Sequence, residues 1–496
     1  MAFKMKLKEL FRNIESCQFK GSQEVLLTGL TANSKSLRPG NLFIAKKGKM
    51  FDGNSYIKEA IQSGACAILT DLFDPCLKKV VQIIHPNPNE IESVLARDYY
   101  QNTSEELFMV GITGTNGKTT ISFIIKYLLD LFYGPCGLIG TIEYIVGSHR
   151  YQATRTTPDV IENHKMLYEM SLSGTKSAVM EVTSHALIQK RVEYIDFDVA
   201  VFSNLTLDHL DYHLTMENYC AAKNCLFEGL GKQQTKKRNE KWAIVNIDDP
   251  WCEQIIKGCQ AHRLTYGIDK PADLQASHIK LSSQGTTINL TYQGQTIECF
   301  WPLLGRFNIY NCLAAIGVLL TQNISLKEIV EKMACIPNVK GRLEKVLNNL
   351  ELDIYVDFAH TDDALSNVLK TLSEIKKGRL LTIFGCGGDR DPSKRPKMAI
   401  ASEQYSDLSI VTSDNPRSEN PISICQEIVT GFVNPNSFIV EIDRRSAIQK
   451  AIEIASPGDM ILIAGKGHET YQILSHQIIE FDDAKVAAEI CLQQNK

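Results

Sequence analysis

The stretch VGITGTNGKTT at residues 110–120 contains the change from strand to helix around which the chain is organised. The apolar run 108–113 is typical of a buried strand, and residues 121–132 have the apolar spacing of an amphipathic helix. The glycines between them occupy a strand-to-helix turn, where free backbone amides point at a ligand. Amides at a helix start, together with a lysine, favour phosphate, so the sequence predicts a nucleotide site.

This turn matches the P-loop pattern only in part, because Ile112 stands where that pattern has its first glycine. The second half agrees, since Gly117 is followed by Lys118, a cation for the phosphates, and by Thr119, a hydroxyl for Mg²⁺. A glycine-rich turn without a ligand would accept many residues at these positions. The sequence therefore favours nucleotide binding over a purely structural turn.

Length and composition indicate an ordinary globular protein. A chain of 496 residues is too long for one core and suggests about three domains. Hydrophobic residues make up 44% and the net charge is -4, which excludes a general attraction to nucleic acid or acidic membranes. Residues 232–241, KQQTKKRNEK, predict a solvated basic loop, with contact to nucleic acid as the alternative.

Cysteine usage and the start of the chain predict a cytoplasmic protein. The 14 cysteines include no CxxC pair, so neither a zinc site nor a disulfide framework is indicated. Residues 1–14, MAFKMKLKELFRNI, are too charged for a signal peptide, and no apolar run approaches the ~20 residues of a membrane span. We expect neither a membrane nor a nucleic acid as a partner.

The predicted elements divide the chain into three α/β domains. Residues 1–100 alternate short strands and helices and form a small N-terminal domain. Residues 101–340 predict a mostly parallel, doubly wound sheet of P-loop type, and residues 341–496 a C-terminal Rossmann-like domain. The expected strands are 108–113, 177–183, 198–204 and 242–247 in the central domain, and 352–357, 379–385, 407–412, 437–442 and 459–464 in the last.

Ligands of such sheets gather at the carboxyl ends of the strands, so the residues after each run are candidates. Glu181 ends an apolar strand and is expected to complete a Mg²⁺ site with Thr119; the alternative is a charged residue closing a strand at the surface. Residues 207–213, LDHLDYH, offer two histidines and two aspartates, suited to metal ligation or proton transfer, with capping as the alternative. We take His209 as a candidate metal ligand. Lys223, from the residues alone, is an ordinary helical lysine with a solvated head.

Polar clusters also follow the strands of the last domain. Basic and acidic residues alternate there, at Arg390, Lys394, Arg395 and Arg417 and at Asp389, Asp391, Asp414 and Glu419. Such a mixture suits a zwitterionic small molecule, because arginine holds a carboxylate bidentately while aspartate or glutamate accepts an ammonium. A structural ion-pair network is the alternative. Together with the phosphate loop, this layout favours an ATP-driven joining of an amine to a carboxylate through an acyl phosphate.

Motifs along almost the entire chain also resemble those of a known family, the Mur ligases. They are SLRPGNLFIAKKG, TGTNGKTT, EVTSHAL, NLTLDHLDYH, AAKNCLF, LLGRFNIYN, VKGRLEKV, VDFAHTDDAL, GCGGDRDPSKRPKM, SDNPRSENP and AGKGHETYQ, in this order. They are most similar to those of the members that add the third peptide residue. The DNPR motif at 414–417 resembles the version that selects meso-2,6-diaminopimelate, because lysine-adding relatives lack its arginine.

The resemblance implies an ATP- and Mg²⁺-dependent ligase that joins meso-2,6-diaminopimelate to the D-glutamate of a UDP-N-acetylmuramoyl-dipeptide in peptidoglycan precursor synthesis. The ATP residues it implies are Gly114, Thr115, Asn116, Gly117, Lys118, Thr119, Thr120, Asn308, Arg342, Asp357 and His360. Lys118, Lys223 and His209 are the implied catalytic residues. The implied metal ligands are Thr119, Glu181, His209 and Lys223, the last as a carbamate, which would overturn its reading as a solvated lysine.

Two further sets of residues follow from the resemblance. Those for the UDP-linked substrate are Ser34, Thr156, Thr157, Thr183, Gln189 and Arg191. Those for diaminopimelate are Arg390, Asp414, Asn415, Pro416, Arg417, Gly465 and Glu469. This second set agrees with the zwitterion site inferred from the charges. A monomer is expected.

Three positions depart from the family pattern, and two other functions stay open. Asn33-Ser34-Lys35 replaces Asp-Ser-Arg, Thr183 replaces a common serine, and Asp362 replaces a proline, none of which removes a group that the chemistry needs. A folylpolyglutamate-synthetase-like ligase would share the ATP loop but lack the N-terminal domain and the DNPR motif. A non-catalytic nucleotide-binding switch would need only some of Lys118, Glu181, His209 and Lys223.

Overall fold

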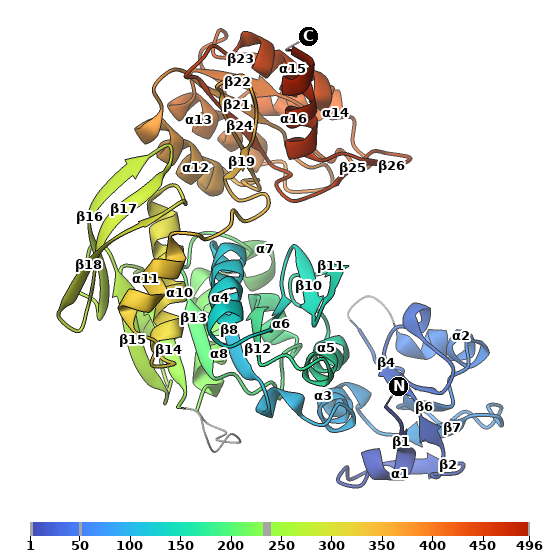
Figure 1. Ribbon diagram of the computed structural model, residues 1–496. Helices are drawn as coiled ribbons and strands as arrows, with labels where there is room; N and C mark the ends of the chain where they lie inside the picture. Colours follow the sequence, from blue (N-terminus) through green and yellow to red (C-terminus); the bar gives the residue numbers. More distant parts are fainter. Residues whose placement is uncertain (1–2, 49–51, 232–239, 495–496) are drawn as a thin grey trace. The chain divides into compact units, whose positions relative to one another are not determined.

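The computed structural model describes residues 3–48, 52–231 and 240–494. Their contacts divide the chain into two units, Met1–Val245 with Asp249–Leu264, and Asn246–Asp248 with Thr265–Lys496. Both units contain helices and largely parallel sheets, which confirms the predicted α/β class (Figure 1). The domain boundaries after residues 100 and 340 stay a prediction.

The first unit begins with a five-stranded sheet of order β2-β7-β6-β5-β4. β4 to β7 are parallel and β2 is antiparallel to β7. The elements are β2 (Gln18–Lys20), β4 (Gly29–Thr31), β5 (Asn41–Ile44), β6 (Ala67–Thr70), β7 (Val81–Ile84) and the helix α3 (Pro88–Tyr99). Leu95 and Tyr99 of α3 belong to the same buried cluster as Leu42 and Leu69 of the sheet, so the predicted small α/β domain is present as a fold.

A second sheet of the first unit carries the phosphate loop. It is part of an 11-stranded sheet, whose strands in this unit follow the order β11-β10-β9-β12-β8-β13-β14; the pairs from β9 to β14 are parallel. The elements are β8 (Phe108–Thr113), α4 (Lys118–Phe132), β9 (Cys136–Ile139), β10 (Glu143–Val146), β11 (His149–Gln152), α5 (Val160–Leu172), β12 (Ser177–Glu181), α6 (Ser184–Ile188), β13 (Val199–Phe202), α7 (Leu210–His213), α8 (Met216–Gly229) and β14 (Trp242–Asn246). The predicted mostly parallel sheet is confirmed.

The strand predicted at 177–183 ends two residues earlier than expected. Glu181 is the last strand residue, and Thr183 is instead the N-cap of α6, because its Oγ1 accepts a hydrogen bond from the Ala186 amide at 3.2 Å. A threonine favours such caps because its hydroxyl satisfies an amide that the first helical turn leaves free.

The predicted basic loop at 232–241 lies outside the described residues except for Glu240 and Lys241. Lys241 is not solvated, since its side chain is 5% exposed and its Nζ lies 2.7 Å from Asp196 Oδ1 and 3.1 Å from Asp198 Oδ1. The prediction is therefore wrong at this residue, because two neighbouring carboxylates compensate its buried charge.

The second unit begins with antiparallel strands and two helices, which precede a six-stranded sheet and its own helices. The sheet has the order β19-β20-β24-β21-β22-β23, and all of its pairs are parallel except β19 with β20. The first elements are β15 (His262–Gly267), which begins at the end of the first unit, β16 (Leu274–Ser282), β17 (Gly285–Tyr292), β18 (Gln295–Trp301), α10 (Arg306–Leu320) and α11 (Leu326–Met333). The sheet is formed by β19 (Glu344–Val346), β20 (Asp353–Asp357), β21 (Leu380–Phe384), β22 (Leu408–Val411), β23 (Phe438–Val440) and β24 (Met460–Ala464).

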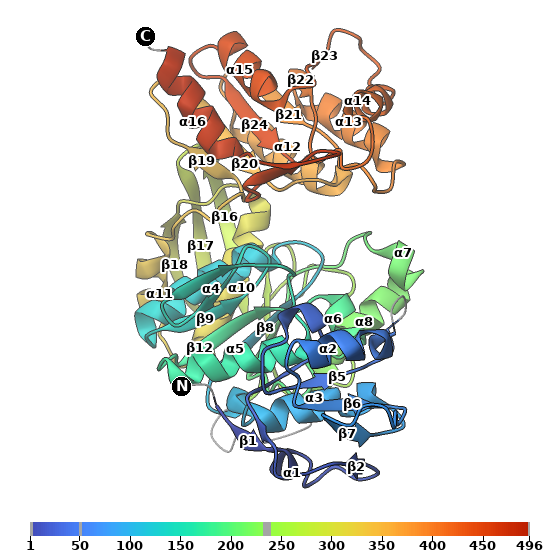
Figure 2. The same ribbon diagram turned by 90° about the vertical axis from the view of Figure 1, so that its right-hand side faces the viewer.

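Helices cover both faces of this sheet, as the Rossmann-like prediction requires (Figure 2). Leu380 and Phe384 of β21 pack in one buried cluster, while Leu381 and Ile383 pack in another. Successive strand residues point to opposite faces, which explains the continuous apolar run. The first cluster contains residues of α12 (Asp362–Ile375), α13 (Lys394–Tyr405) and α14 (Pro421–Val429), and the second those of α15 (Arg444–Ile454) and α16 (Asp483–Gln494).

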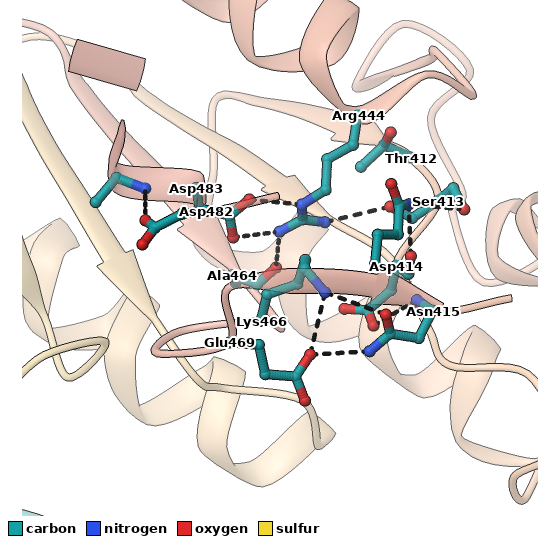
Figure 3. Close-up of polar contacts among 12 residues, drawn as sticks. Thr412, Ser413, Asp414, Asn415, Arg444, Ala464, Lys466, Glu469, Asp482 and Asp483 are labelled. Atoms are coloured by element: carbon teal, nitrogen blue, oxygen red, sulfur yellow. Dashed lines mark hydrogen bonds and ion pairs between the residues drawn. The ribbon is translucent and has the colours of Figure 1, made fainter. Parts of the chain in front are cut away.

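A buried ion pair joins the start of α15 to the start of α16 (Figure 3). The guanidinium of Arg444 donates from Nε to Asp483 Oδ1 at 2.7 Å and from Nη2 to Asp483 Oδ2 at 2.8 Å, and both side chains are 0% exposed. Nη2 also donates to the carbonyl of Ala464, the last residue of β24, at 3.0 Å. The pair therefore anchors a strand end to two helix starts.

No helix among the described residues combines the length and the apolar character needed to cross a membrane.

Replacing Asp483 by asparagine should lower the stability of the second unit strongly, because it leaves the buried Arg444 charge uncompensated. Removing one partner of such a pair costs about 3–5 kcal/mol. Arg445→Ala is the matched control, since its pair with Glu489 is 43% and 56% exposed and is expected to contribute about 0–1 kcal/mol. Thermal unfolding of both variants measures the difference, and equal melting temperatures would contradict the assignment.

Candidate active site

The phosphate loop follows β8 and depends on glycine at its first position. Gly114 has φ +148° and Gly117 has φ +88°, a region that other residues rarely adopt. A Cβ on Gly114 would lie 1.9 Å from Ser203 Oγ, so no side chain fits there. The Thr115 amide donates to the carbonyl of Asn204 at 2.8 Å, which ties the loop to the end of the neighbouring strand β13.

Two lysine side chains meet at one carbonyl of this loop. Lys118 Nζ donates to the Gly114 carbonyl at 2.8 Å, and Lys223 Nζ donates to the same oxygen at 2.8 Å. Lys223 is 1% exposed, and its Nζ lies 4.5 Å from the centre of the Tyr219 ring. The prediction that Lys223 is a solvated helical lysine is therefore wrong, because the face of α8 that carries Lys223 packs against the loop. Burial, reinforced by the charge of Lys118, lowers the pKa of Lys223 well below its usual range.

Glu181 is the centre of a hydroxyl cluster beside the loop. Its carboxylate is 0% exposed, so the alternative of a surface residue is excluded. Thr119 Oγ1 donates to Glu181 Oε2 at 2.9 Å, and the Thr141 amide donates to Oε1 at 2.8 Å. The Thr141 hydroxyl also donates to Oε2, at 2.9 Å. The structure thus brings the two predicted Mg²⁺ ligands Thr119 and Glu181 into direct contact.

His209 belongs to a cluster of aromatic rings on α6, α7 and α8. Its ring centre lies 5.0 Å from that of His185 and 6.0 Å from that of Tyr219, and His213 lies 5.4 Å from His185. Burial lowers the pKa of all three histidines. Their imidazoles are therefore neutral near pH 7, the form in which histidine binds metals.

The donor set beside the loop fits Mg²⁺ bound together with a nucleotide. Among the described residues, no group of three or more His, Cys, Asp or Glu side chains is arranged to hold a metal ion. Mg²⁺ does not need one, because it is usually bound by one or two carboxylates, phosphate oxygens and water. Thr119 and Glu181 are such a set of oxygen donors, at a loop suited to phosphate.

Five residues predicted for the UDP-linked substrate form one network next to Glu181. The Thr157 hydroxyl donates to the Glu181 carbonyl at 2.7 Å and lies 3.3 Å from Thr183 Oγ1, and Arg191 Nη1 donates to the Thr157 carbonyl at 2.8 Å. Gln189 Oε1 accepts from Arg191 Nη2 at 2.6 Å. Thr156 joins through Thr141, at 3.1 Å between hydroxyls. Ser34 belongs to another part of the unit, where it begins a 3-10 turn after β4.

Two residues predicted for the nucleotide, Arg342 and His360, lie against the ring of Phe358 in the second unit. The Arg342 guanidinium lies 4.8 Å from the ring centre, and His360 and His468 lie 4.7 Å and 5.0 Å from it. Asp357 is buried, and its carboxylate accepts hydrogen bonds from the backbone amides of Leu343 and Ala359. Asn308 lies on α10, where its amide donates to the Leu304 carbonyl at 2.8 Å.

The predicted amino-acid residues lie on three neighbouring strand ends of the six-stranded sheet. β21 pairs with both β22 and β24, so the loops that begin at Gly385, Thr412 and Gly465 are adjacent. A Cβ on Gly465, which has φ +112°, would lie 2.6 Å from Asp414 Oδ2. Asn415 Nδ2 donates to Glu469 Oε2 at 2.8 Å, which joins two of these loops directly (Figure 3).

Arg417 is held by the backbone of the same loops. It has φ +52°, its amide donates to the Ile473 carbonyl at 3.1 Å, and its Nη1 donates to the Gly388 carbonyl at 2.7 Å. Pro416 precedes it and packs closely, since a Cβ on Gly388 would lie 2.0 Å from the Pro416 carbonyl oxygen. Arg390 is exposed on the loop after β21. The guanidinium of Arg417 is thus held by the Gly388 carbonyl, on the loop whose Asn415 contacts Glu469.

Not every charge of the predicted zwitterion cluster serves a ligand. Arg395 is 3% exposed in its side chain and pairs with Glu419 at 2.8 Å and with Glu427 at 2.9 Å. Asp389 accepts the hydroxyl of Ser418, and Asp391 caps its own turn through Ser393. For Arg395 and Glu419 the contacts are those of the structural ion-pair alternative, whereas Asp389 and Asp391 have serine partners.

Two residues of the site were missed at the level of the sequence. Thr141, which donates twice to Glu181, follows β9, a strand that the apolar pattern did not reveal. Tyr219 contacts the Lys223 ammonium from four residues earlier in the same helix. Helical spacing would have paired Tyr219 with Lys223, whereas Thr141 has no local signal.

A cavity of about 500 Å³ lies elsewhere in the first unit and is lined by residues such as Leu187, Tyr194 and Cys225. None of the predicted site residues lines it. The candidate active site is therefore defined by strand ends and their donors, and not by this cavity.

Three family models match the chain. The Mur ligase family catalytic domain matches residues 26–100, the Mur ligase middle domain residues 112–319, and the Mur ligase glutamate ligase domain residues 341–467. Together they cover most of the chain, and their limits follow the order of the predicted domains.

Relatives and a solved structure agree with these matches. The chain is 45% identical over 489 residues to the UDP-N-acetylmuramoyl-L-alanyl-D-glutamate--2,6-diaminopimelate ligase of Chlamydia caviae, covering 98% of this chain and 99% of the relative. It is 41% identical over 488 residues to the enzyme of the same name from Syntrophomonas wolfei, covering 98% and 99%. A solved structure of a ligase of this name matches with a TM-score of 0.70 and 30% identity over 100% of both chains. The chain therefore belongs to the Mur ligase family of ATP-dependent ligases.

Proposed function

We propose that this Mur ligase joins meso-2,6-diaminopimelate to the γ-carboxylate of the D-glutamate in UDP-N-acetylmuramoyl-L-alanyl-D-glutamate, in peptidoglycan precursor synthesis. The observation that carries the proposal is the loop after β22, where Arg417 Nη1 donates to the Gly388 carbonyl at 2.7 Å and Asn415 Nδ2 donates to Glu469 Oε2 at 2.8 Å. One end of diaminopimelate presents a carboxylate and an ammonium, which a guanidinium and a carboxylate on adjoining loops can hold. The names of the relatives support the same substrate pair.

The first unit would supply the groups for the phosphates of ATP. Lys118 and the backbone amides at the start of α4 would hold the phosphates, and Lys118 would stabilise charge that develops during phosphoryl transfer. Thr119 and Glu181 would hold Mg²⁺, which adds further positive charge at the phosphates. The γ-carboxylate oxygen attacks the terminal phosphorus, ADP leaves, and the resulting acyl phosphate carries a good leaving group.

The second half of the reaction is the attack of the amine on this acyl phosphate. The nitrogen forms the amide bond, phosphate leaves with the C–O bond electrons, and the nitrogen gives up a proton. Arg417 holds the carboxylate at the distal end of the amino acid, and Glu469 accepts its ammonium. Arg390, Asn415 and Gly465 complete this set on the same loops. Positioning of the amine is the main contribution of these residues.

We further propose that Lys223 is carbamylated and, with His209, binds a second metal ion. A carbamate forms when a neutral amine attacks carbon dioxide, and the lowered pKa of Lys223 raises the neutral fraction of this amine at neutral pH. Carbamylation turns a buried cation into an anion, a charge suited to a metal ligand. The protein is expected to act as a monomer in the cytoplasm, without membrane or nucleic acid as a partner.

Two other functions are distinguished by a single assay. A folate-extending ligase would release phosphate with a folate and glutamate, and a nucleotide-binding switch would not couple ATP to either amino acid. We expect phosphate release from ATP only when the UDP-muramoyl-dipeptide and meso-2,6-diaminopimelate are both present. Equal turnover with L-lysine would contradict the selectivity assigned to the DNPR motif.

Arg417→Ala should raise the KM for diaminopimelate about 10- to 100-fold, because a charge-assisted hydrogen bond contributes roughly 1.5–3 kcal/mol. The KM for ATP should stay within about twofold, since ATP binding uses other residues. Arg445→Ala, an exposed arginine of the same unit, is the control. Steady-state kinetics with each substrate varied measures both values, and an unchanged KM for the amino acid would remove Arg417 from the site.

Lys223→Ala should lose most activity, and a short carboxylate such as formate should restore part of it by replacing the carbamate. Independently of activity, ¹³C NMR of wild-type protein under ¹³C-labelled carbon dioxide should show a carbamate signal that is missing in the variant. Lys165→Ala, an exposed lysine with 51% side-chain exposure in the same unit, should behave like the wild type. Full activity of Lys223→Ala without formate would refute the proposal.

Gly114→Ala should abolish binding of ATP and ADP, because a Cβ would lie 1.9 Å from Ser203 Oγ and would displace the loop. Gly229→Ala is the control, since nothing lies within 4 Å of a Cβ at this position. Isothermal titration calorimetry measures the affinities. Wild-type affinity in Gly114→Ala would show that the loop does not hold the phosphates.

A further inference from the structure

Lys466 has a buried ammonium among the loops that carry the proposed amino-acid site, although it is not one of the predicted site residues (Figure 3). Its side chain is 0% exposed. Its Nζ donates to Asn415 Oδ1 at 3.1 Å and to Glu469 Oε2 at 3.0 Å. Both partners are side chains of the proposed amino-acid site.

These contacts determine how the Asn415 amide is turned. An ammonium and a backbone N–H can only donate, so Asn415 Oδ1 has to face both Lys466 and the Ile473 amide, which lies 2.9 Å away. The NH₂ group of Asn415 then points to Glu469 Oε2, at 2.8 Å. Lys466 thus orients Asn415 as well as Glu469.

The same contacts leave one edge of the Glu469 carboxylate available. Oε2 accepts from both Lys466 and Asn415, whereas no described residue donates a hydrogen bond to Oε1. The Glu469 side chain is 20% exposed. One oxygen is therefore used inside the protein, and the other is left to accept an ammonium from outside.

Holding the strand end is not the role of Lys466. The guanidinium of Arg444 already holds the carbonyl of Ala464 at the end of β24, at 3.0 Å. Among the described residues, the Lys466 ammonium donates hydrogen bonds to Asn415 and Glu469 and to no backbone carbonyl, and it also lies 5.8 Å from the centre of the Tyr471 ring. The hydrogen bonds of Lys466 to Asn415 and Glu469 therefore explain its position.

The charges of the site indicate what Lys466 selects. Arg390, Arg417 and Lys466 are cations and Asp414 and Glu469 are anions, so these five side chains together carry one net positive charge. Diaminopimelate with its attacking amine uncharged carries one more negative charge than lysine in the same state. Loss of the Lys466 charge would remove the advantage of the more anionic amino acid.

We propose that Lys466 is a positioning residue that makes the amino-acid site select an amino acid with a carboxylate and an ammonium at its distal end over one with an ammonium alone. The inference rests on the proposed function, because it concerns the same site. Lys466 acts through Asn415 and Glu469 and touches no reacting atom.

The test compares Lys466→Met, which removes the charge and the donor, with Lys466→Gln, which keeps a donor without the charge. We expect both to lower the ratio of kcat/KM for meso-2,6-diaminopimelate over L-lysine by about tenfold or more, with KM for ATP within about twofold. Lys485→Met is the matched control, since this lysine is 66% exposed in the same unit. A wild-type ratio in a folded Lys466→Met or in Lys466→Gln would overturn the proposal.

A double-mutant cycle separates positioning from general loosening of the fold. If Lys466 acts through Glu469, the KM for diaminopimelate in Lys466→Met/Glu469→Gln should match that of Glu469→Gln alone. Additive effects would overturn the coupling. Wild-type protein that does not use diaminopimelate would refute the proposed function instead, so the two failures are distinguishable.

Discussion

The hydrogen bond from Thr119 to Glu181 is the interaction on which the phosphate site of this protein depends. It exists because β12 runs parallel to β8 in a register that places Glu181 opposite Ile112, two residues before the loop begins. The carboxyl ends of both strands therefore lie at the same edge of the sheet. A shift of this register by one residue would turn Glu181 to the other face of the sheet and separate its carboxylate from the Thr119 hydroxyl.

Compensation of buried charge determines the geometry of both units. Lys223 is buried against a carbonyl of the phosphate loop, and Arg444 and Lys466 are buried in the second unit with Asp483 and Glu469 as partners. A buried charge is stable only when its donors or acceptors are satisfied, so each of these groups restricts the loop that supplies its partner. The loops that carry the candidate site residues are held by the same contacts that stabilise the fold.

Sequence patterns predicted the elements and placed the candidate site residues at strand ends, since both depend on local patterns. The apolar runs located the strands of the two large sheets, and the rule that ligands bind at strand ends pointed to Glu181 and to Asn415. The errors concern residues whose partners lie far along the chain. Lys223 was taken as solvated and Arg395 as a ligand group, because neither Gly114 nor Glu427 is a sequence neighbour.

The sequence by itself determined the α/β class, the phosphate loop and, through its motifs, the membership in the Mur ligases, because each is encoded in a short run of residues. Only the tertiary structure decided which charged side chains are buried and paired within the protein and which stay exposed. Burial and pairing depend on contacts between segments that are distant in the sequence. Thr141 and Glu181 are 40 residues apart, and Lys466 and Asn415 are 51 residues apart. No local pattern contains that information, since the distance between two charged atoms follows from the packing of whole strands and helices.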